Sequence, residues 1–185
     1  MKIIIMRHAK VKIENRKIYA NELKSVVEEY DQAPIEKDME NYEALKELAD
    51  EVDYFVSSGL RRSVDSLALL GKKANHLDEL FAEVESPYTK RKIMKLPLYT
   101  WGFWFKLVWS LGYSGGSRSY KESKEDARQG AVKLEGFAHE HCTVLLLGHG
   151  LKNMLIAKAL KKQGWSEQKK MSLKNWGYGV YEKGL

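Results

Sequence analysis

Three short stretches of the sequence end an apolar run in side chains that could bind or transfer an anionic group. In KIIIMRHAK the apolar residues 3–6 are followed at once by Arg7 and His8. In YFVSSGLRR two serines and two arginines follow the run, and in TVLLLGHG the run ends in His149 and Gly150. Arginine donates paired hydrogen bonds to phosphate oxygens, and neutral histidine is a nucleophile near pH 7. The pattern therefore indicates a site for a phosphoryl group.

The apolar runs before these residues are typical of strands that are buried on both faces of a sheet. They predict strands at residues 3–6, 54–56 and 142–149, a further strand or extended segment at 78–85, and a last strand at 176–184. Apolar residues at helical spacing predict helices over 39–52, 57–75, 124–141 and 151–164, whereas 11–38 is interpreted as a polar stretch. Strands that alternate with helices indicate an α/β domain.

The order of these elements brings the polar side chains together. The carboxyl ends of neighbouring parallel strands meet at one edge of a sheet, and helices that begin there point free backbone N–H groups toward it. We therefore expect one cluster at that edge, made of Arg7, His8, His149 and an arginine from the pair Arg61 and Arg62. Of this pair, Arg61 is interpreted as a solvated helix residue. Such a cluster suits a dianion, most simply a phosphoryl group.

Length and composition fit a single domain over residues 1–185, with 44% apolar and 30% charged residues and no linker or low-complexity tract. Cys142 is the single cysteine, so the chain cannot form an internal disulfide, and we expect this side chain to be buried beside an apolar run. The sequence shows neither a signal peptide nor a transmembrane span. Together these features predict a cytoplasmic protein.

The net charge of +6 at pH 7 favours acidic partners but does not choose among them. Phosphorylated small molecules, nucleic acid and anionic membranes all fit this charge. No nucleic-acid-binding motif accompanies it, and no apolar stretch is uniform enough to span a bilayer. We therefore expect a phosphorylated small-molecule substrate, no nucleic-acid partner and no membrane partner, while a homodimer stays open.

The motifs resemble those of the histidine phosphatase superfamily, the phosphoglycerate-mutase-like proteins. MRHAK resembles the family's RHG or RHA signature, and SSGLRRSVDSL resembles its serine-serine-x-leucine-x-arginine element, with Arg62 at the arginine. LLLGHGLKNMLIA resembles the second-histidine element, with Gly148 where the family has serine. ELFAEVE resembles the acidic element, and KESKEDARQGAVKLEGF the helix before the second histidine. The resemblance implies a three-layer sandwich with a mostly parallel central sheet flanked by helices.

The resemblance also implies a role for each residue. His8 would be the nucleophile that forms a phosphohistidine, and a backbone carbonyl must hold its second ring nitrogen. Glu83 would be the general acid and base, with Glu85 as the alternative because both project from one face of an extended segment. His149 would also be catalytic, because it would stabilise the negative charge on the phosphoryl group during transfer. The phosphate would be bound by Arg7, Arg62 and Gly150, and no metal or other cofactor is implied.

Residues 86–123 depart from the regular alternation and are predicted to form an insertion that acts as a lid. Trp101, Trp104 and Trp109 lie there among basic and glycine residues. They fit a substrate-covering lid, a dimer contact or a packed subdomain, and the last is commonest because tryptophans mostly bury area. An insertion of this length favours a small-molecule phosphatase over the compact protein-phosphohistidine phosphatases of the family.

The residues after the first histidine bear on the reaction. Cofactor-dependent mutases of the family continue with a glycine-glutamate-serine-x-tryptophan-asparagine run, whereas this chain has AKVKIEN. We therefore expect a metal-independent phosphatase that hydrolyses a phosphomonoester through a phosphohistidine on His8. The alternatives are a protein phosphohistidine phosphatase, a phosphoglycerate-type mutase and a pseudoenzyme that only binds a phosphate ligand. The sequence does not identify the substrate.

Overall fold

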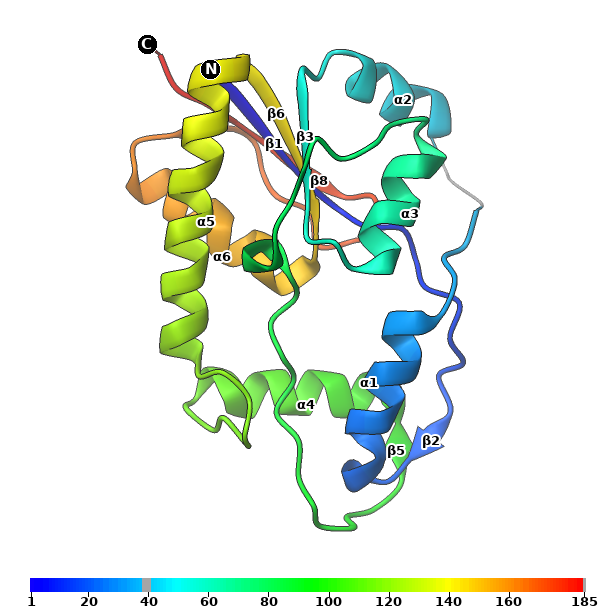
Figure 1. Cartoon of the computed structure of the whole chain (residues 1–185). Coiled ribbons are helices and arrows are strands. Elements are labelled where there is room, and N and C mark those ends of the chain that lie inside the picture. Colours follow the sequence, from blue (N-terminus) through cyan, green and yellow to red (C-terminus); the bar gives the residue numbers. More distant parts are fainter. Residues whose placement is uncertain (38–40, 185) are drawn as a thin grey trace.

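The structure is a computed structural model that describes residues 1–37 and 41–184. Its central sheet is built around the first strand of the chain (Figure 1). The strands are β1 Lys2–Arg7, β2 Lys17–Ile18, β3 Tyr54–Ser57, β4 His76–Leu77, β5 Leu96–Pro97, β6 Thr143–Gly148, β7 Ser166–Lys169 and β8 Tyr178–Glu182. The helices are α1 Leu23–Gln32, α2 Tyr42–Asp50, α3 Arg61–Leu69, α4 Leu98–Ser110, α5 Tyr120–His141 and α6 Gly150–Lys162, with short 3₁₀ turns at Ala20–Glu22 and Glu79–Phe81.

Six strands form one sheet in the order β4-β3-β6-β1-β8-β7. The neighbours from β4 to β1 are parallel, whereas β8 is antiparallel to β1 and β7 is antiparallel to β8. The register pairs Arg7 with Gly148 and Ser57 with Leu147. The carboxyl ends of β1, β3 and β6 therefore lie side by side, and the segments that leave them share one edge of the sheet.

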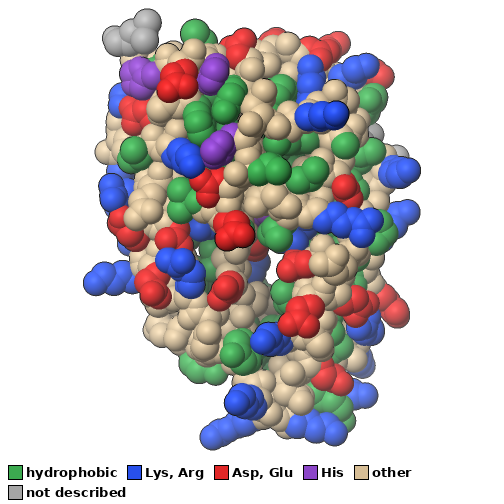
Figure 2. All heavy atoms as spheres, viewed as in Figure 1, with side chains coloured by type: hydrophobic (Ala, Val, Ile, Leu, Met, Phe, Trp, Pro, Cys, Tyr) green, Lys and Arg blue, Asp and Glu red, His purple; other side chains and the backbone are tan. Residues whose placement is uncertain are grey.

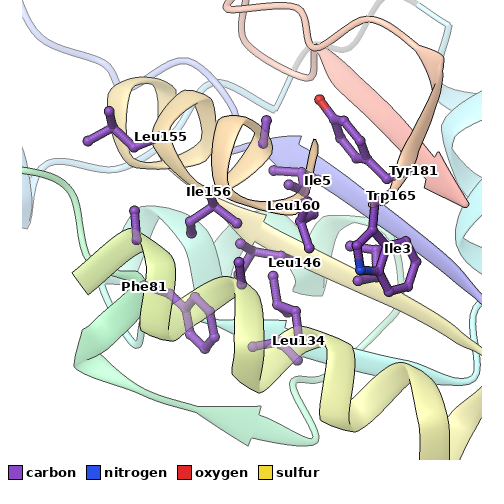
Figure 3. Close-up of a cluster of buried hydrophobic side chains, with 14 of the residues drawn as sticks. Ile3, Ile5, Phe81, Leu134, Leu146, Leu155, Ile156, Leu160, Trp165 and Tyr181 are labelled. Carbon is purple, nitrogen blue, oxygen red and sulfur yellow. The ribbon is translucent and has the colours of Figure 1, made fainter. Parts of the chain in front are cut away.

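Side chains of β1 alternate between two cores, one on each face of the sheet. Ile3 and Ile5 pack with residues of α5 and α6, such as Leu134 and Ile156 (Figure 3). Ile4 and Met6 point to the other face, where the core takes in Leu45 of α2 and Leu67 of α3 as two of its members. Because successive strand residues face opposite ways, a continuous apolar run supplies both cores. The expected three-layer sandwich with a mostly parallel sheet is confirmed.

A smaller unit lies at the far end of the molecule, where Figure 1 shows α1, α4, β2 and β5 together. β2 and β5 form a short antiparallel ladder. A separate apolar core joins this ladder to the two helices; its buried members are Ile18, Ala20, Leu23, Val26, Leu98, Trp101 and Phe105. The Trp101 ring N–H donates to the Ile18 carbonyl at 3.0 Å. The predicted insertion thus packs on residues that follow the first strand, and not on the main sheet alone.

Several element predictions were wrong in ways that the local sequence explains. Residues 78–85, predicted as a strand or an extended segment, form no strand: a 3₁₀ turn at Glu79–Phe81 is followed by irregular chain that begins extended at Ala82. The strand at this edge of the sheet is β4. The stretch 11–38, interpreted as polar and described up to residue 37, contains α1, which buries only Leu23 and Val26. The helix expected over 57–75 is shorter and runs over Arg61–Leu69. Of the helix expected over 39–52, residues 39–40 lie outside the described residues, and α2 begins at Tyr42.

The long helix α5 begins earlier than residue 124 because of a capping box. The Ser119 hydroxyl accepts from the Glu122 N–H at 3.2 Å, and the Glu122 carboxylate accepts from the Ser119 N–H at 2.8 Å. This exchange satisfies two N–H groups that a helix start leaves without partners. The pattern serine-x-x-glutamate is visible in the sequence and fixes the true start of α5 at Tyr120. The insertion therefore ends a few residues before 123.

Cys142 is exposed, so the expected burial of its thiol was wrong. The residue caps the end of α5 with a positive φ of 60°, in the tight turn into β6. A turn of this kind lies at the surface even though the strand after it is buried. Within the part of the chain that the structure describes, no helix is both long and apolar enough to cross a membrane.

Candidate active site

His8 follows the last residue of β1 and has one ring nitrogen already occupied. Its Nδ1 lies 2.6 Å from the Ala9 carbonyl oxygen, so Nδ1 carries the hydrogen and donates it. Its Nε2 makes no hydrogen bond to any described residue. Burial, and then the charges of Arg62 and Arg7, lower the pKa of His8 to about 3, against the opposing effect of the Ala9 bond. At neutral pH the ring is therefore uncharged, and the lone pair on Nε2 is available to attack an electrophile.

The backbone around His8 is braced from both sides. The Ala9 N–H donates to the Ser66 hydroxyl at 2.9 Å, and that hydroxyl donates to the Arg62 carbonyl at 2.5 Å. On the other side, the Asn175 amide donates to the His8 carbonyl at 2.9 Å. Neither Ser66 nor Asn175 was singled out from the sequence, because their contacts span 57 and 167 residues. They fix the main chain that holds the nucleophile.

Arg7 is the last residue of β1, and its guanidinium bonds the Leu173 carbonyl through Nη1. Its Nε is buried and has no partner within the described residues. A buried donor without a partner is costly, so this N–H is available to a bound anion. Gly150 lies against the same guanidinium: a Cβ at this position would be 3.5 Å from Arg7 Nε, which is an ordinary contact.

Arg62, in the first turn of α3, is almost fully buried at 3% exposure. Its Nη1 lies 2.5 Å from the carboxylate of Asp31, near the end of α1, and its guanidinium carbon lies 5.1 Å from the centre of the Tyr30 ring. The neighbouring Arg61 is exposed and pairs with Asp65 at 3.3 Å. The interpretation of Arg61 as a solvated residue and of Arg62 as the inward one therefore agrees with the geometry.

His149 is close to His8 but both of its ring nitrogens are occupied. Arg62 Nε donates to Nδ1 at 3.2 Å, so Nε2 carries the hydrogen and donates to the Ser58 hydroxyl at 2.7 Å. The ring centres of the two histidines are 5.2 Å apart. Burial lowers the pKa of His149 well below its ordinary value, so this ring is also neutral. His149 bonds Arg62 and is not among the residues that line the cavity described below, so its role in stabilising charge on the transferring group stays a prediction.

Gly148 replaces the serine of the expected motif because another side chain fills its space. A Cβ at Gly148 would be 2.5 Å from the Asn153 side-chain oxygen, closer than any real contact. That oxygen accepts from the His149 N–H at 3.2 Å, and the Asn153 amide donates to the Met6 carbonyl at 2.9 Å. Asn153 therefore ties the end of β1 to the start of α6. It was missed from the sequence, although its spacing of four from His149 was visible.

Glu83 and Glu85 lie in the irregular chain after the 3₁₀ turn, and both line the cavity. Glu83 is partly buried and accepts hydrogen bonds from the Val84 N–H at 3.0 Å and the Lys152 N–H at 3.2 Å. Burial by itself would raise the pKa of Glu83, but the charge of Lys106 and these two N–H groups outweigh it and lower the pKa to about 2. Glu85 is exposed. Geometry therefore distinguishes the two carboxylates that the sequence left as alternatives.

These side chains surround one cavity of about 360 Å³. Arg7, His8 and Arg62 form what we call the strand-end wall. The opposite wall, which we call the helical wall, is lined from α1 and α4 by Leu23, Val26, Val27, Tyr30, Asp31, Leu98, Tyr99, Gly102, Phe103 and Lys106. Glu83, Val84 and Glu85 run between the two walls. Figure 2 shows this view of the molecule hollowed in its lower half, with carboxylates around the rim.

The three tryptophans of the insertion do not line this cavity. Trp101 and Trp109 are buried, and the Trp109 ring N–H donates to the Arg118 carbonyl at 2.8 Å. Trp104 is 49% exposed and faces a different hollow. Trp101 packs in the core of the small unit and Trp109 in the main core. The cavity is lined instead by other residues of the same helix, among them Tyr99, Phe103 and Lys106.

Comparisons by sequence find nothing similar: no family model matches the chain, and no curated protein does. Solved structures do match, over nearly its whole length. The product of the open reading frame Rv3214 from Mycobacterium tuberculosis has a TM-score of 0.63 at 14% identity, covering 97% of this chain and 89% of that one. The mycobacterial glucosyl-3-phosphoglycerate phosphatase Rv2419c has a TM-score of 0.60 at 15% identity, covering 97% and 88%.

A third match is a mutant of the phosphoserine phosphatase from Entamoeba histolytica in complex with phosphoserine. Its TM-score is 0.54 at 14% identity, and the match covers 97% of this chain and 89% of that one. The chain shares the fold of these solved structures. At such low identity the likeness concerns the fold, and the chemistry of the site has to be argued from the residues themselves.

Proposed function

We propose that the protein is a metal-independent phosphatase that hydrolyses a phosphomonoester through a phosphohistidine on His8. The observation that carries this proposal is the state of His8: Nδ1 is held by the Ala9 carbonyl, while the free Nε2 lies in a cavity with two inward arginines. A neutral ring in this tautomer is a nucleophile, and the arginines supply positive charge where a transferring phosphoryl group needs it.

In the first step the Nε2 lone pair of His8 forms a bond to phosphorus, and the bond from phosphorus to the ester oxygen breaks. That oxygen leaves with the bonding electrons and takes a proton from the Glu83 carboxyl group. Arg7 and Arg62 hold the non-reacting phosphate oxygens while negative charge shifts across the group. His149 acts as a positioning residue, because its Nδ1 holds Arg62 through the Nε hydrogen bond.

In the second step water attacks the phosphohistidine. The Glu83 carboxylate takes a proton from the water as its oxygen bonds to phosphorus, the nitrogen–phosphorus bond breaks, and the electron pair returns to Nε2. Inorganic phosphate leaves, and Glu83 gives its proton up to the departing phosphate or to water, because its carboxylate form is the stable one in the empty site. A carboxyl group that donates in one step and accepts in the other restores the site after each cycle.

The low pKa of Glu83 sets the protonation state in which substrate binds. With a pKa of about 2, Glu83 is a carboxylate in the empty site at neutral pH. The proton for the first step therefore arrives with the substrate, as the monoanion of the phosphate ester, whose second pKa is about 6. We expect kcat/KM to be highest below about pH 6 and to fall as the dianion replaces the monoanion above it.

The helical wall favours an ester whose alcohol part is apolar or aromatic. Leu23, Val26, Tyr99 and Phe103 are among the side chains that line this wall. Besides the two arginines and Glu83, the charged side chains that line the cavity are Asp31, Glu85 and Lys106. An alcohol part with further negative charge would meet the first two, so sugar bisphosphates and other polyanions fit poorly.

The test is hydrolysis of an aryl phosphate in the presence of EDTA by the wild type and by His8→Ala. We expect His8→Ala to lose activity by about a thousandfold or more, because no other group can form the phosphoryl intermediate. Intact-protein mass spectrometry after rapid mixing is expected to detect one phosphoryl group on the wild type and none on His8→Ala. His139→Ala, which changes an exposed histidine of α5, serves as the control and is expected to keep full activity.

The outcomes separate the alternatives. Activity that survives in His8→Ala would contradict the phosphohistidine route. Vanadate binding by a wild type that hydrolyses none of a set of alkyl and aryl phosphates would favour a phosphate-binding pseudoenzyme. Phosphoryl transfer back to an added alcohol in preference to water would favour a mutase. Activity on phosphohistidine in a protein but not on small esters would favour a protein phosphatase.

A further inference from the structure

Helix α4 has apolar side chains on two faces, and only one of them is covered. Leu98, Trp101, Phe105 and Trp109 are buried. Phe103, Trp104, Leu107 and Leu111 recur at helical spacing on the other side, and all are exposed, Leu111 to 80%. Single exposed apolar residues are ordinary, but a stripe of them marks a surface that meets something else.

The loop before this helix extends the exposed stripe and adds positive charge. Ile93 and Met94 are 43% and 64% exposed, and they lie between Lys90, Arg91 and Lys92 on one side and Lys95 on the other. A hollow of about 930 Å³, lined mainly by apolar side chains, opens between this loop and α4. Figure 2 shows Lys and Arg side chains beside hydrophobic ones at this lower end of the molecule.

The charge of the whole chain is concentrated in the same segment. From Ser86 to Lys121 there are seven lysines and arginines and no aspartate or glutamate. Since the net charge of the chain is +6, the remainder of the chain has a net charge of −1. The basic loop is also held in place: β5 pairs with β2, and the ammonium groups of Lys92 and Lys95 lie 4.4 Å and 4.9 Å from the centre of the Tyr19 ring.

We propose that residues 89–111 form a docking surface for an anionic lipid bilayer. Exposed aliphatic and aromatic side chains enter the boundary between headgroups and acyl chains, and neighbouring lysines and arginines pair with anionic headgroups. The sequence predicted no membrane partner because a span is absent, but a helix that lies on the surface needs no span.

Two other occupants fit the surface less well. A second copy of the chain, related by a twofold axis, would bring one basic loop close to another, and like charges repel. Single-stranded nucleic acid is bound by aromatic side chains on which bases stack, whereas Ile93, Met94, Leu107 and Leu111 offer no such face. An anionic bilayer can bury the aliphatic side chains and pair with the positive charge of the lysines and arginines.

Docking would place the mouth of the active-site cavity beside the bilayer. Phe103 belongs to the exposed stripe and also lines that cavity. Tyr99 and Lys106 of the same helix line the cavity too. This inference does not depend on the proposed reaction. It requires only that α4 and its preceding loop are placed as they are.

Flotation with lipid vesicles tests the surface. We expect the full chain to float with vesicles that contain phosphatidylglycerol, not with pure phosphatidylcholine, and to be released by high salt. Two surface variants, Ile93→Ser with Met94→Ser and Lys90→Glu with Arg91→Glu, are each expected to weaken binding by about tenfold or more. Each variant has a matched control that should bind as the wild type does. The control for the apolar change is Val132→Ser, at an exposed position of α5, and the control for the charge change is Lys158→Glu with Lys170→Glu, both exposed and outside α4 and its preceding loop.

The same proteins distinguish this proposal from the reaction. His8→Ala should float unchanged, and the surface variants should hydrolyse a water-soluble aryl phosphate at the wild-type rate, which also shows that they fold. Absence of flotation, or flotation that neither surface variant weakens, would overturn the proposal. So would sedimentation that finds a dimer which the surface variants dissociate, or a salt-sensitive affinity for RNA that exceeds the affinity for vesicles.

Discussion

The two walls of the active-site cavity are built in opposite ways. The strand-end wall consists of side chains that leave adjacent parallel strands or the helix start beside them. Buried hydrogen bonds hold His8 and Arg62, and Arg7 bonds the Leu173 carbonyl. The helical wall consists of side chains on α1 and α4, which share a small core of their own, while the end of α4 reaches the main core through Trp109. One wall has its geometry set by the sheet register, and the other by helix packing.

This difference separates the chemistry from the choice of substrate. A displacement of Arg62 or His8 would require β1, β6 and α3 to move, and these share two buried cores. The side chains of the helical wall can change without disturbing that sheet, because they pack against the separate small core, and Trp109, which joins α4 to the main core, does not line the cavity. We infer that the strand-end wall carries the phosphoryl transfer, and that α1 and α4 select the alcohol part of the ester.

Glu83 lies between the walls, and its substitution has the largest effect expected after that of His8. Glu83→Gln keeps the shape but can neither donate nor accept the proton. We expect kcat for an alkyl phosphate to fall by about 100- to 1000-fold, and the phosphohistidine to accumulate with an aryl phosphate, whose leaving group needs no proton. Steady-state kinetics on both esters, with mass spectrometry of the trapped enzyme, measure this.

Glu85→Gln is the matched control for that experiment, because Glu85 lines the same cavity but is exposed. Its kcat should stay within about twofold of the wild type. If the large loss appeared in Glu85→Gln instead, the general acid would be Glu85, and the hydrogen bonds to Glu83 would have only a structural role.

Acid should destabilise the protein through the strand-end wall first. Unfolded His8 binds a proton below its ordinary pKa of 6.5, whereas folded His8 does so only near 3. Between these values the unfolded state binds more protons, so the free energy of unfolding is greatest above pH 6.5 and falls as the pH falls. Glu83, lowered from 4.5 to about 2, adds to the loss only below pH 4.5.

Urea unfolding at pH 6.5 and pH 4.5 isolates the histidines from Glu83. Over this interval we expect His8 to account for a loss on the order of 2 kcal/mol, which His8→Asn should abolish while His139→Asn should not. His149 contributes in the same direction and remains in both variants. A wild type equally stable at the two pH values would show that these rings are protonated in the folded protein.

The strand-end wall could be predicted from the sequence because its information is local. Each of its residues directly follows an apolar run or begins the next helix, and parallel strands of similar length end at one edge. Arg7, His8 and Arg62 were placed correctly on that basis. The hydrogen bonds of His149 could not be predicted, because they depend on which ring nitrogen faces Ser58 and which faces Arg62. The need for glycine at position 148 could not be predicted either, because it comes from the Asn153 side chain that fills the space of a Cβ there.

The helical wall could not be predicted because its contacts are distant in sequence and weakly patterned. α1 buries few apolar residues and was interpreted as polar, so Asp31 was not expected beside Arg62. In α4 nearly every position is apolar, and such a pattern does not show which face is covered. The tryptophans were the visible signal, yet Tyr99 and Phe103 are the residues that line the cavity.

Asp31 is where the two walls touch, and it gives the smallest predicted effect. Its carboxylate pairs with Arg62 in the empty site, although its own side chain is 34% exposed and lines the cavity. A phosphate that binds Arg62 must compete with this carboxylate for the same guanidinium. We expect Asp31→Asn to bind vanadate or inorganic phosphate about three- to tenfold more tightly, with kcat changed little, as measured by inhibition of aryl phosphate hydrolysis.

Asp65→Asn provides the matched control, since Asp65 pairs with the exposed Arg61 one residue away and does not line the cavity. The same change of net charge there should leave the inhibition constant as it is in the wild type. Weaker binding in Asp31→Asn would mean that the pair orients Arg62 toward the phosphate, and Arg62 would then depend on the helical wall for its position. Tighter binding would mean that the strand-end wall is complete by itself, and that α1 acts on it only as a competing anion which the substrate displaces.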